Sequence, residues 1–249
     1  MRRRPIVACA WLSSVFVATS VVSACQGHAP DSQAESSSAL EQASSVPHAN
    51  LHNASWRLVA APYALSGATS TALADGRVLV TGGSKPAGDI STVTNEAYLF
   101  APKDDTWTPL PPMHVPRTDH TATRLLDGRV LVFGGHTGGS VSKSSELFDP
   151  ISSTWARVDS EPETGRFVHT ASLLPNGKVL VVGGYWDDIV AKVHVYDPES
   201  GPTGTWSEGP PLEGGRVYHA AAVRPDGTVF ISGGYHLESG FEMKVATNL

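Results

Sequence analysis

Residues 120–136 read HTATRLLDGRVLVFGGH, two short apolar runs that are joined by an Asp-Gly and closed by a pair of glycines. The same phrase recurs as HTASLLPNGKVLVVGGY at 169–185 and as HAAAVRPDGTVFISGGY at 219–235, and an earlier version, ATSTALADGRVLVTGGS, occupies 68–84. The glycine pairs begin at 82, 134, 183 and 233, so they are spaced by 52, 49 and 50 residues. A fixed period of this length is typical of propellers and solenoids.

Each repeat predicts four short strands. In the second repeat, 121–126 and 129–133 form a hairpin around an Asp-Gly pair, whose residues supply the two positive φ angles of a two-residue loop. The second strand is apolar on both faces, which predicts burial on both sides. The glycines at 134–135 let a neighbouring backbone approach closely or the chain turn through positive φ. The third and fourth strands are predicted over SELFDP at 145–150 and TWARV at 154–158.

These features resemble the Kelch repeat. The resemblance rests on the DGRVLVFGG-type core, on an aromatic-Asp-Pro at 148–150 and 196–198, and on a Trp that follows each of these, and it covers about residues 55–249. It implies an all-β fold, a Kelch-type β-propeller in which each repeat is a four-stranded blade around a central channel. The first repeat departs from the pattern, because Phe100-Ala101-Pro102 stands in place of the aromatic-Asp-Pro.

The ends of the array suggest how the ring closes. The last repeat lacks a fourth strand with its Trp, whereas SWRLVA at 55–60 precedes the first repeat as an unmatched fourth strand. We expect this strand to pair with a third strand at 241–246 and to bury Trp56 there, which completes four blades and leaves no unpaired edge. The alternative is that these repeats are part of a larger propeller, since the family more usually has more blades.

The N-terminal segment is typical of an export signal: Arg2, Arg3 and Arg4 precede an apolar stretch that ends in small residues. Val22-Ser23-Ala24-Cys25 resembles a bacterial lipobox, which implies cleavage after residue 24 and lipid attachment to Cys25. An ordinary cleaved signal and an uncleaved helix are the alternatives. We therefore expect a signal peptide at 1–24, a lipidated Cys25 with a flexible linker to residue 50, and the propeller at 51–249. The expected location is the cell envelope, with the membrane reached through the lipid anchor only.

The composition excludes several classes of partner and site. The formal net charge is -6, which argues against nucleic acid as a partner because nucleic acids reward basic patches. Cys9 and Cys25 are the two cysteines, so 26–249 can hold neither a disulfide nor a Cys-based metal site. We expect no cofactor.

An Arg and a His recur before the first strand of three repeats, and the first repeat has Leu65 and Ala68 at those places. A residue that is repeated in each blade usually serves what each blade needs, such as a hydrogen bond to the next blade. We predict a structural role and no metal site, because no carboxylate motif accompanies all three histidines. The residues are Arg117, His120, Arg166, His169, Arg216 and His219.

The segments after the glycine pairs differ between repeats, and variable loops on one face of a rigid scaffold commonly carry binding. Exposed aromatic side chains beside carboxylates suit sugars or peptides, because a ring stacks on an apolar face while acids accept hydroxyl or amine hydrogens. An alternative is that the tyrosines only plug the channel mouth. The candidate binding residues are His136, Tyr185, Trp186, Asp187, Asp188, Tyr235 and His236.

Two functions remain open at this point. The first is a surface-anchored binding or scaffold module for a protein or glycan ligand. The second is a propeller enzyme of the epimerase or mutarotase kind that acts on sugars with acid–base side chains such as Asp187, Asp188, Arg166 and His169. The copper oxidases among Kelch-like propellers need a tyrosine crosslinked to a cysteine, and no cysteine follows residue 25. We favour binding, because no nucleophile motif or phosphate loop is present in the sequence.

Overall fold

The structure is a computed structural model that describes residues 57–62, 65–87, 90–235 and 244–246. The expected signal peptide at 1–24, the lipidated Cys25 with its linker, Trp56 and His236 lie outside these residues. The chain divides into two units, Met1–Val59 and Ala60–Leu249, and the strands all belong to the second. Within the described ranges, no helix is long and apolar enough to cross a membrane.

Every described secondary-structure element is a strand, which confirms the all-β prediction. In chain order the strands are β1 Thr69–Ala72, β2 Val78–Thr81, β3 Ser84–Ala87, β4 Ile90–Val93, β5 Ala97–Ala101, β6 Thr106–Pro109, β7 Thr121–Arg124, β8 Val130–Phe133, β9 Ser145–Asp149, β10 Thr154–Arg157, β11 Thr170–Leu173, β12 Val179–Val182, β13 Val193–Asp197, β14 Thr205–Gly209, β15 Ala220–Val223, β16 Val229–Ser232 and β17 Lys244–Ala246.

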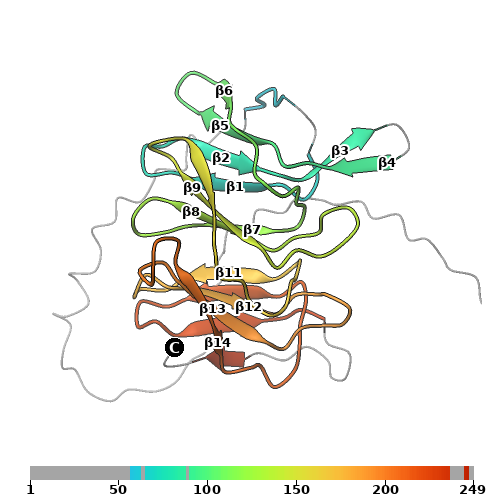
Figure 1. The fold of residues 1–249 in the computed structure, drawn as a ribbon, viewed down its shortest axis with the longest axis vertical. Helices are drawn as coiled ribbons and strands as arrows, with labels where there is room; N and C mark the ends of the chain where they lie inside the picture. The colour runs from blue at the N-terminus through green and yellow to red at the C-terminus, as the bar shows by residue number, and fades with distance from the viewer. Residues whose placement is uncertain (1–56, 63–64, 88–89, 236–243, 247–249) are drawn as a thin grey trace, which may run out of the picture. The chain divides into compact units, whose positions relative to one another are not determined.

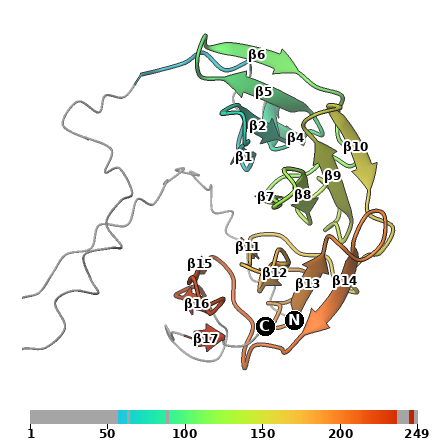
Figure 2. The ribbon, with the colours of Figure 1, turned by 90° about the vertical axis from the view of Figure 1, so that its left-hand side faces the viewer.

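The strands form one antiparallel sheet per repeat, and each sheet is a blade. The first blade has the order β1-β2-β5-β6, the second β7-β8-β9-β10, the third β11-β12-β13-β14 and the fourth β15-β16-β17 (Figure 1). The innermost strands β1, β7, β11 and β15 contact each other in succession, while β6, β10 and β14 lie at the outer edge (Figure 2). The repeat period therefore predicted the Kelch-type blades correctly.

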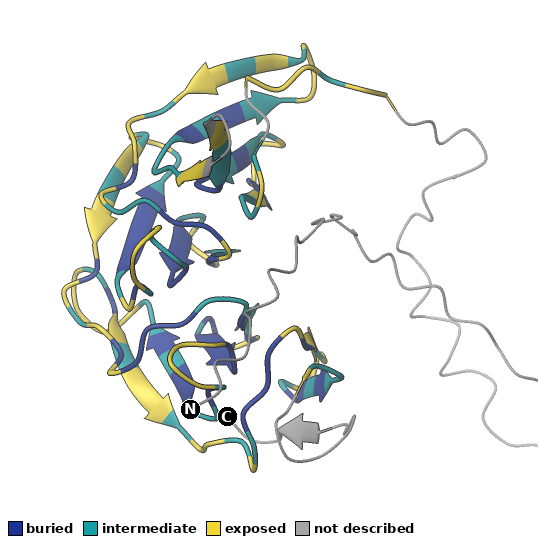
Figure 3. Cartoon of the chain, turned by 90° about the vertical axis from the view of Figure 1, so that its right-hand side faces the viewer, coloured by how far each residue is buried: buried dark blue, intermediate teal, exposed yellow. Residues whose placement is uncertain are grey.

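The hydrophobic core lies between the blades because the second strand of each blade is apolar on both faces. On β8, Leu131 and Phe133 pack toward the third blade, whereas Val130 and Val132 pack toward the first. On β12, Leu180 and Val182 pack in the same way toward the fourth blade. The outer strands alternate between exposed and half-buried residues (Figure 3). Each fully buried aliphatic side chain contributes about 1.5–3 kcal/mol, so the stability is spread along the interfaces between blades.

The hairpin turns differ from the prediction of two-residue loops. Leu73 N donates to Arg77 O and Gly76 N donates to Leu73 O, so the loop holds three residues, 74–76. The other three repeats repeat this pattern, and only the glycine of each turn has a positive φ. The loop has three residues because a type I turn followed by one left-handed glycine joins the strands, and such a loop needs a positive φ at the glycine only. Asp75 stabilises the turn, because its carboxylate accepts a hydrogen bond from Arg77 N at 3.0 Å.

The first glycine pair is followed by a short β-ribbon instead of the polar loop that the sequence predicted. Ser84–Ala87 pairs in antiparallel register with Ile90–Val93, and the ribbon extends beyond the first sheet (Figure 1). The corresponding segments of the second and third repeats form no named strand. The first blade therefore presents a different loop structure at this end of the sheet.

The fourth blade has three strands among the described residues. The third strand, β17, lies within the predicted 241–246 and pairs with β16, while 241–243 lie outside the described residues. Residues 57–60, the described part of the expected closing strand, are not assigned to a strand, and Leu58 is 100% exposed. The pairing of Trp56 with the fourth blade stays a prediction, since Trp56 is outside the described residues.

Candidate functional site

The glycine pairs of the first three repeats meet the next blade at very close range. Gly134 and Gly135 have φ angles of 70° and 94°, and a Cβ added at Gly134 would lie 2.4 Å from the backbone oxygen of Arg166. The equivalent distances from Gly82 to Arg117 O and from Gly183 to Arg216 O are also 2.4 Å. Both reasons that the sequence offered for the glycines therefore apply at once: close approach and positive φ.

The repeated arginines connect two successive glycine pairs. The backbone oxygen of Arg166 accepts a hydrogen bond from Gly135 N of the preceding blade at 2.8 Å. Its guanidinium donates to Gly183 O of its own blade at 3.1 Å and to Lys192 O at 2.7 Å. Arg117 repeats this arrangement with Gly83 and Gly134, and both arginine side chains are fully buried.

The repeated histidines connect each blade to the innermost strand of the blade before it. Nε2 of His169 is hydrogen-bonded to Thr121 Oγ1 at 2.9 Å, and Nε2 of His219 to Thr170 Oγ1 at 2.8 Å. His120 bonds in the same way to Thr69 at 3.1 Å. We call the repeated Arg–His pairs together with the glycine pairs the interblade clamp.

Burial keeps the clamp histidines neutral. Desolvation, with the charge of Arg117 as a second cause, lowers the pKa of His120 to about 3. Desolvation and Arg216 likewise lower the pKa of His219 to about 4, and burial and Arg166 lower the pKa of His169 well below 6.5. No group of three or more His, Cys, Asp or Glu residues in the described part of the chain is arranged to hold a metal ion.

Arg117 and Arg166 have different partners for their buried charges. Arg117 Nη2 donates to Glu146 Oε1 at 2.9 Å, and this carboxylate also accepts from the backbone and ring of His114. Desolvation raises the pKa of Glu146, but these donors and the Arg117 charge outweigh it, so the pKa is lowered overall. In the third blade His194 stands at the corresponding place beside Arg166, and desolvation lowers its pKa to about 4. Burial lowers the pKa of Arg166 to about 10.

A pocket of about 400 Å³ opens where the chain enters the four innermost strands. We call it the inner pocket. Each blade contributes two adjacent residues at the same place in its repeat, and the second of the two is the clamp histidine or, in the first blade, alanine. The lining residues are Gly67, Ala68, Asp119, His120, Val168, His169, Tyr218 and His219.

The first residue of each lining pair has a left-handed backbone. The φ angles are 65° at Gly67, 55° at Asp119, 49° at Val168 and 56° at Tyr218. Among these, a β-branched valine with a positive φ is a genuine outlier. Such residues cost of order 1–3 kcal/mol each and persist where the surrounding structure holds them. The same left-handed conformation in each blade thus places four different residues at one pocket.

Hydrogen bonds between blades hold this backbone in place. Asp119 N donates to Gly67 O at 2.9 Å, and Val168 N donates to Asp119 O at 3.2 Å. Asp119 and Val168 are therefore each bonded to the equivalent residue of the preceding blade. The chain on either side is fixed as well, because Phe167 and Tyr185 exchange two backbone hydrogen bonds of 3.1 and 2.9 Å. The rim of the inner pocket is consequently a set of fixed positions.

The predicted binding residues lie at the same end of the blades but do not line the inner pocket. His136, Tyr185 and Tyr235 pair by backbone with Thr118, Phe167 and Val217, which precede the left-handed residues. Phe167 stands between two of these rings, with centroid distances of 5.8 Å to His136 and 5.7 Å to Tyr185. Trp186, Asp187 and Asp188 are exposed, and His236 lies outside the described residues.

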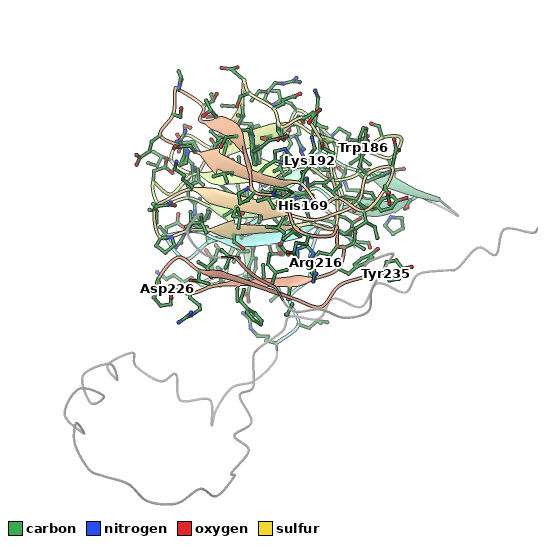
Figure 4. All side chains as sticks on the ribbon, turned by 90° about the horizontal axis from the view of Figure 1, so that it is seen from below. His169, Trp186, Lys192, Arg216, Asp226 and Tyr235 are labelled. Carbon is green, nitrogen blue, oxygen red and sulfur yellow. The ribbon has the colours of Figure 1, made fainter. Side chains whose placement is uncertain are left out.

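Figure 4 shows how the labelled side chains divide between these roles. Trp186 and Tyr235 lie toward one end of the strands, and Asp226, in a hairpin turn, lies at the other. His169 and Arg216 lie between them, within the blades. Trp186 is 45% exposed and Tyr235 is 60% exposed, so both are free to contact a ligand at this end.

The sequence reasoning missed three residues that line the inner pocket, each of which stands directly before a repeated His in the sequence. Asp119, Val168 and Tyr218 occupy one position of the R-x-x-H spacing, and they differ from repeat to repeat. That contrast, a variable residue directly before a repeated one, is the signal that could have identified them. Their left-handed backbone could not have been read from Val or Tyr, which rarely adopt it.

Three similar proteins place these features in context. The chain is 33% identical over 82 residues to galactose oxidase from Gibberella zeae, which is 32% of this chain and 11% of the relative. It is 36% identical over 85 residues to Kelch-like protein 30 from Homo sapiens, which is 34% of this chain and 14% of the relative. The chain therefore spans only a small part of the length of the curated relatives it matches.

A solved structure titled "Structure of YjhT" superposes with a TM-score of 0.59 at 19% sequence identity, and the match covers 68% of this chain and 59% of that one. This likeness concerns the fold alone. The model of the KLHDC2/KLHL20/DRC7 Kelch-repeats domain matches residues 35–234, which is most of the chain. The chain, with its four successive blades, therefore belongs to this Kelch-repeat family.

Proposed function

We propose that this chain is a ligand-binding module, and that its ligand occupies the inner pocket and contacts the surrounding loops. One observation carries the proposal: four equivalent backbone positions with positive φ present Gly67, Asp119, Val168 and Tyr218 to a single pocket. Strained backbone with variable side chains inside a repeated frame is typical of a functional site. A volume of about 400 Å³ lies in the range of small-molecule sites.

The chemistry of the pocket supports binding better than catalysis. The clamp histidines are neutral, and their Nε2 atoms are hydrogen-bonded to threonine hydroxyls of the preceding blade. Asp119 is the carboxylic acid among the lining residues, and its carboxylate accepts a hydrogen bond from Thr118 at 3.3 Å. A single carboxylate beside an exposed tyrosine and a valine orients a ligand, whereas acid–base catalysis generally needs a second positioned group.

We further propose that the module is held at a membrane surface by lipid on Cys25, and that its ligand is a protein or glycan component or a small molecule of that environment. The lipobox-like Val22-Ser23-Ala24-Cys25 supports this location. Metabolic labelling with radioactive palmitate tests it. Wild type should incorporate label and Cys25→Ala should not, and equal labelling of the two would exclude the anchor.

Binding panels test the site. The full-length chain is screened against immobilised glycans, peptides and small polar metabolites, and each binder is then measured with three variants of unchanged melting temperature. Tyr218→Ala should weaken binding by roughly tenfold or more, as expected when a central aromatic contact is lost. Ile151→Ala, which removes an exposed side chain from the turn after β9, should have no effect.

Tyr235→Ala distinguishes a ligand site in the inner pocket from a ligand site at the outer loops. Tyr235 and Tyr218 are similarly exposed, at 60% and 67%, but only Tyr218 lines the pocket. A larger loss with Tyr235→Ala than with Tyr218→Ala would move the site to the outer loops. The absence of any binder on all panels would count against a binding function.

A further inference from the structure

The inner pocket holds one carboxylate, that of Asp119. Among the described residues, no Lys or Arg forms an ion pair with Asp119. Arg117, two residues before it, directs its guanidinium into its own blade and pairs with Glu146. The lysines at this end of the blades are also engaged, as Lys85–Glu96, Lys143–Glu161 and Lys192–Glu163. His136 is the charged group of the protein that lowers the pKa of Asp119, and no Lys or Arg of the described residues pairs with this carboxylate, so a ligand can bring the balancing charge.

The packing around Asp119 keeps its carboxylate open to the pocket. A Cβ added at Gly67 would lie 2.9 Å from Asp119 Oδ1, so the missing side chain of Gly67 makes the room that this oxygen occupies. The hydroxyl of Thr118 donates to Oδ2 at 3.3 Å. A carboxylate can accept about four hydrogen bonds, so most of its acceptor capacity is unused by the described residues.

The environment makes a charged partner favourable. Desolvation at the pocket wall raises the pKa of the Asp119 carboxyl, although hydrogen bonding by Thr118 opposes this. A carboxylate that has lost part of its water gains more from an approaching cation than one in bulk solvent. Asp187 and Asp188, in the loop after β12, also form no ion pair among the described residues.

The other lining side chains supply an apolar surface. Val168 and Tyr218 stand at the equivalent positions of the next two blades, and Tyr218 is 67% exposed. An aromatic face attracts both apolar groups and organic cations. Gly67, the equivalent residue of the first blade, adds no side chain to this surface.

We propose that the inner pocket binds a small organic ammonium compound, a protonated amine attached to an apolar or ring-bearing group. The ammonium donates its hydrogens to Asp119, and the attached group lies against Tyr218 and Val168. This proposal rests on the proposed binding function of the same pocket and adds the class of ligand to it.

Three probes with one ring and different charge test this proposal: benzylamine, benzyl alcohol and benzoate. Binding to the full-length chain is measured at near-neutral pH by ligand-observed NMR titration. Benzylamine should bind about tenfold more tightly than benzyl alcohol, as expected for a charge-assisted hydrogen bond. Benzoate should not bind, because it would meet Asp119 with the same charge. Equal affinity for benzylamine and benzoate, or no binding of benzylamine, would overturn the proposal.

Two isosteric variants assign the effect to one carboxylate. Asp119→Asn should reduce benzylamine affinity by about tenfold while leaving the affinity for benzyl alcohol unchanged. Glu161→Gln removes a carboxylate at the same end of the blades but outside the pocket, and should leave both affinities unchanged. If both variants weaken benzylamine binding equally, the carboxylates at this end of the blades attract the ammonium without distinction. The specific contact with Asp119 is then excluded.

These experiments separate failure of the ammonium proposal from failure of the proposed binding site. If panel ligands lose affinity in Tyr218→Ala but none is an amine and Asp119→Asn has no effect, the pocket binds and the ammonium class is wrong. If panel ligands are insensitive to Tyr218→Ala, the proposed site itself is wrong.

Discussion

Trp155 and Trp186 carry the same side chain in opposite environments. Trp155 packs on Phe148 at a ring-centroid distance of 4.9 Å, and its indole nitrogen donates to Pro111 O at 2.8 Å. It belongs to the core between the first and second blades, whereas Trp186 lies in an exposed loop. Trp155→Ala should therefore cost an amount toward the lower end of about 3–5 kcal/mol, since the ring is half-buried.

Thermal unfolding of the two variants checks this prediction. Trp155→Ala should lower the melting temperature clearly, and Trp186→Ala should leave it near that of the wild type. If Trp186→Ala is as destabilising as Trp155→Ala, the loop after β12 is part of the packed structure and is not free for a ligand.

The clamp histidines make stability depend on pH. Burial, then Arg216, lowers the pKa of His219 to about 4 in the folded state, while an unfolded histidine titrates near 6.5. As pH falls below about 6.5 the unfolded chain binds more protons, so stability is lost between about pH 6.5 and 4, at up to about 1.4 kcal/mol per pH unit for each such histidine. His219→Gln should flatten this decline, and denaturant melts at several pH values measure it. Parallel curves for the two proteins would show that His219 does not contribute.

At the scale of the elements, Gly134 and Gly233 allow a matched comparison of the same residue with and without a following blade among the described residues. Gly134 and Gly233 have φ angles of 70° and 66°, but only Gly134 has the next blade's backbone within reach, at 2.4 Å from an added Cβ. Gly233→Ala should cost about 1–2 kcal/mol from the left-handed backbone alone. Gly134→Ala should cost about 2–5 kcal/mol, because overpacking adds to that strain.

Chemical denaturation of the two glycine variants measures the difference. Equal destabilisation would mean that Gly233 also has a close neighbour, as it would if another blade packed against the fourth. Gly128→Ala is a further control, because a Cβ at this turn position meets no heavy atom within 4 Å.

The elements also show what the sequence could predict. The recurrence of the glycine pairs and the apolar runs at 130–133 and 179–182 was sufficient for the blades and for burial on both faces. The turns were mistaken because Asp-Gly is compatible with two-residue and three-residue loops, and the hydrogen bond from Gly76 N to Leu73 O decides between them. The inner pocket was missed because it depends on the left-handed backbone at 119, 168 and 218, which the side chains there do not favour.

At the scale of the whole propeller unit, the clamp residues repeat and the pocket residues vary within the same four-residue spacing. Arg and His hold neighbouring blades together, and the residue before each His faces the inner pocket. The first blade has Ala68 at the histidine position, and the fourth has Ala220 where the other blades offer a threonine to the next histidine. Variation is thus concentrated at the pocket and at the two ends of the array.

Hydrogen–deuterium exchange of the full-length chain, with and without a ligand found on the binding panels, tests the central claim most directly. Binding in the inner pocket should protect the backbone amides of residues 118–120, 167–169 and 217–219 together, although they are about fifty residues apart in sequence. Protection confined to the outer loops at 136–141 and 185–190, or to the hairpin turns at the opposite end, would contradict a ligand site at the inner pocket.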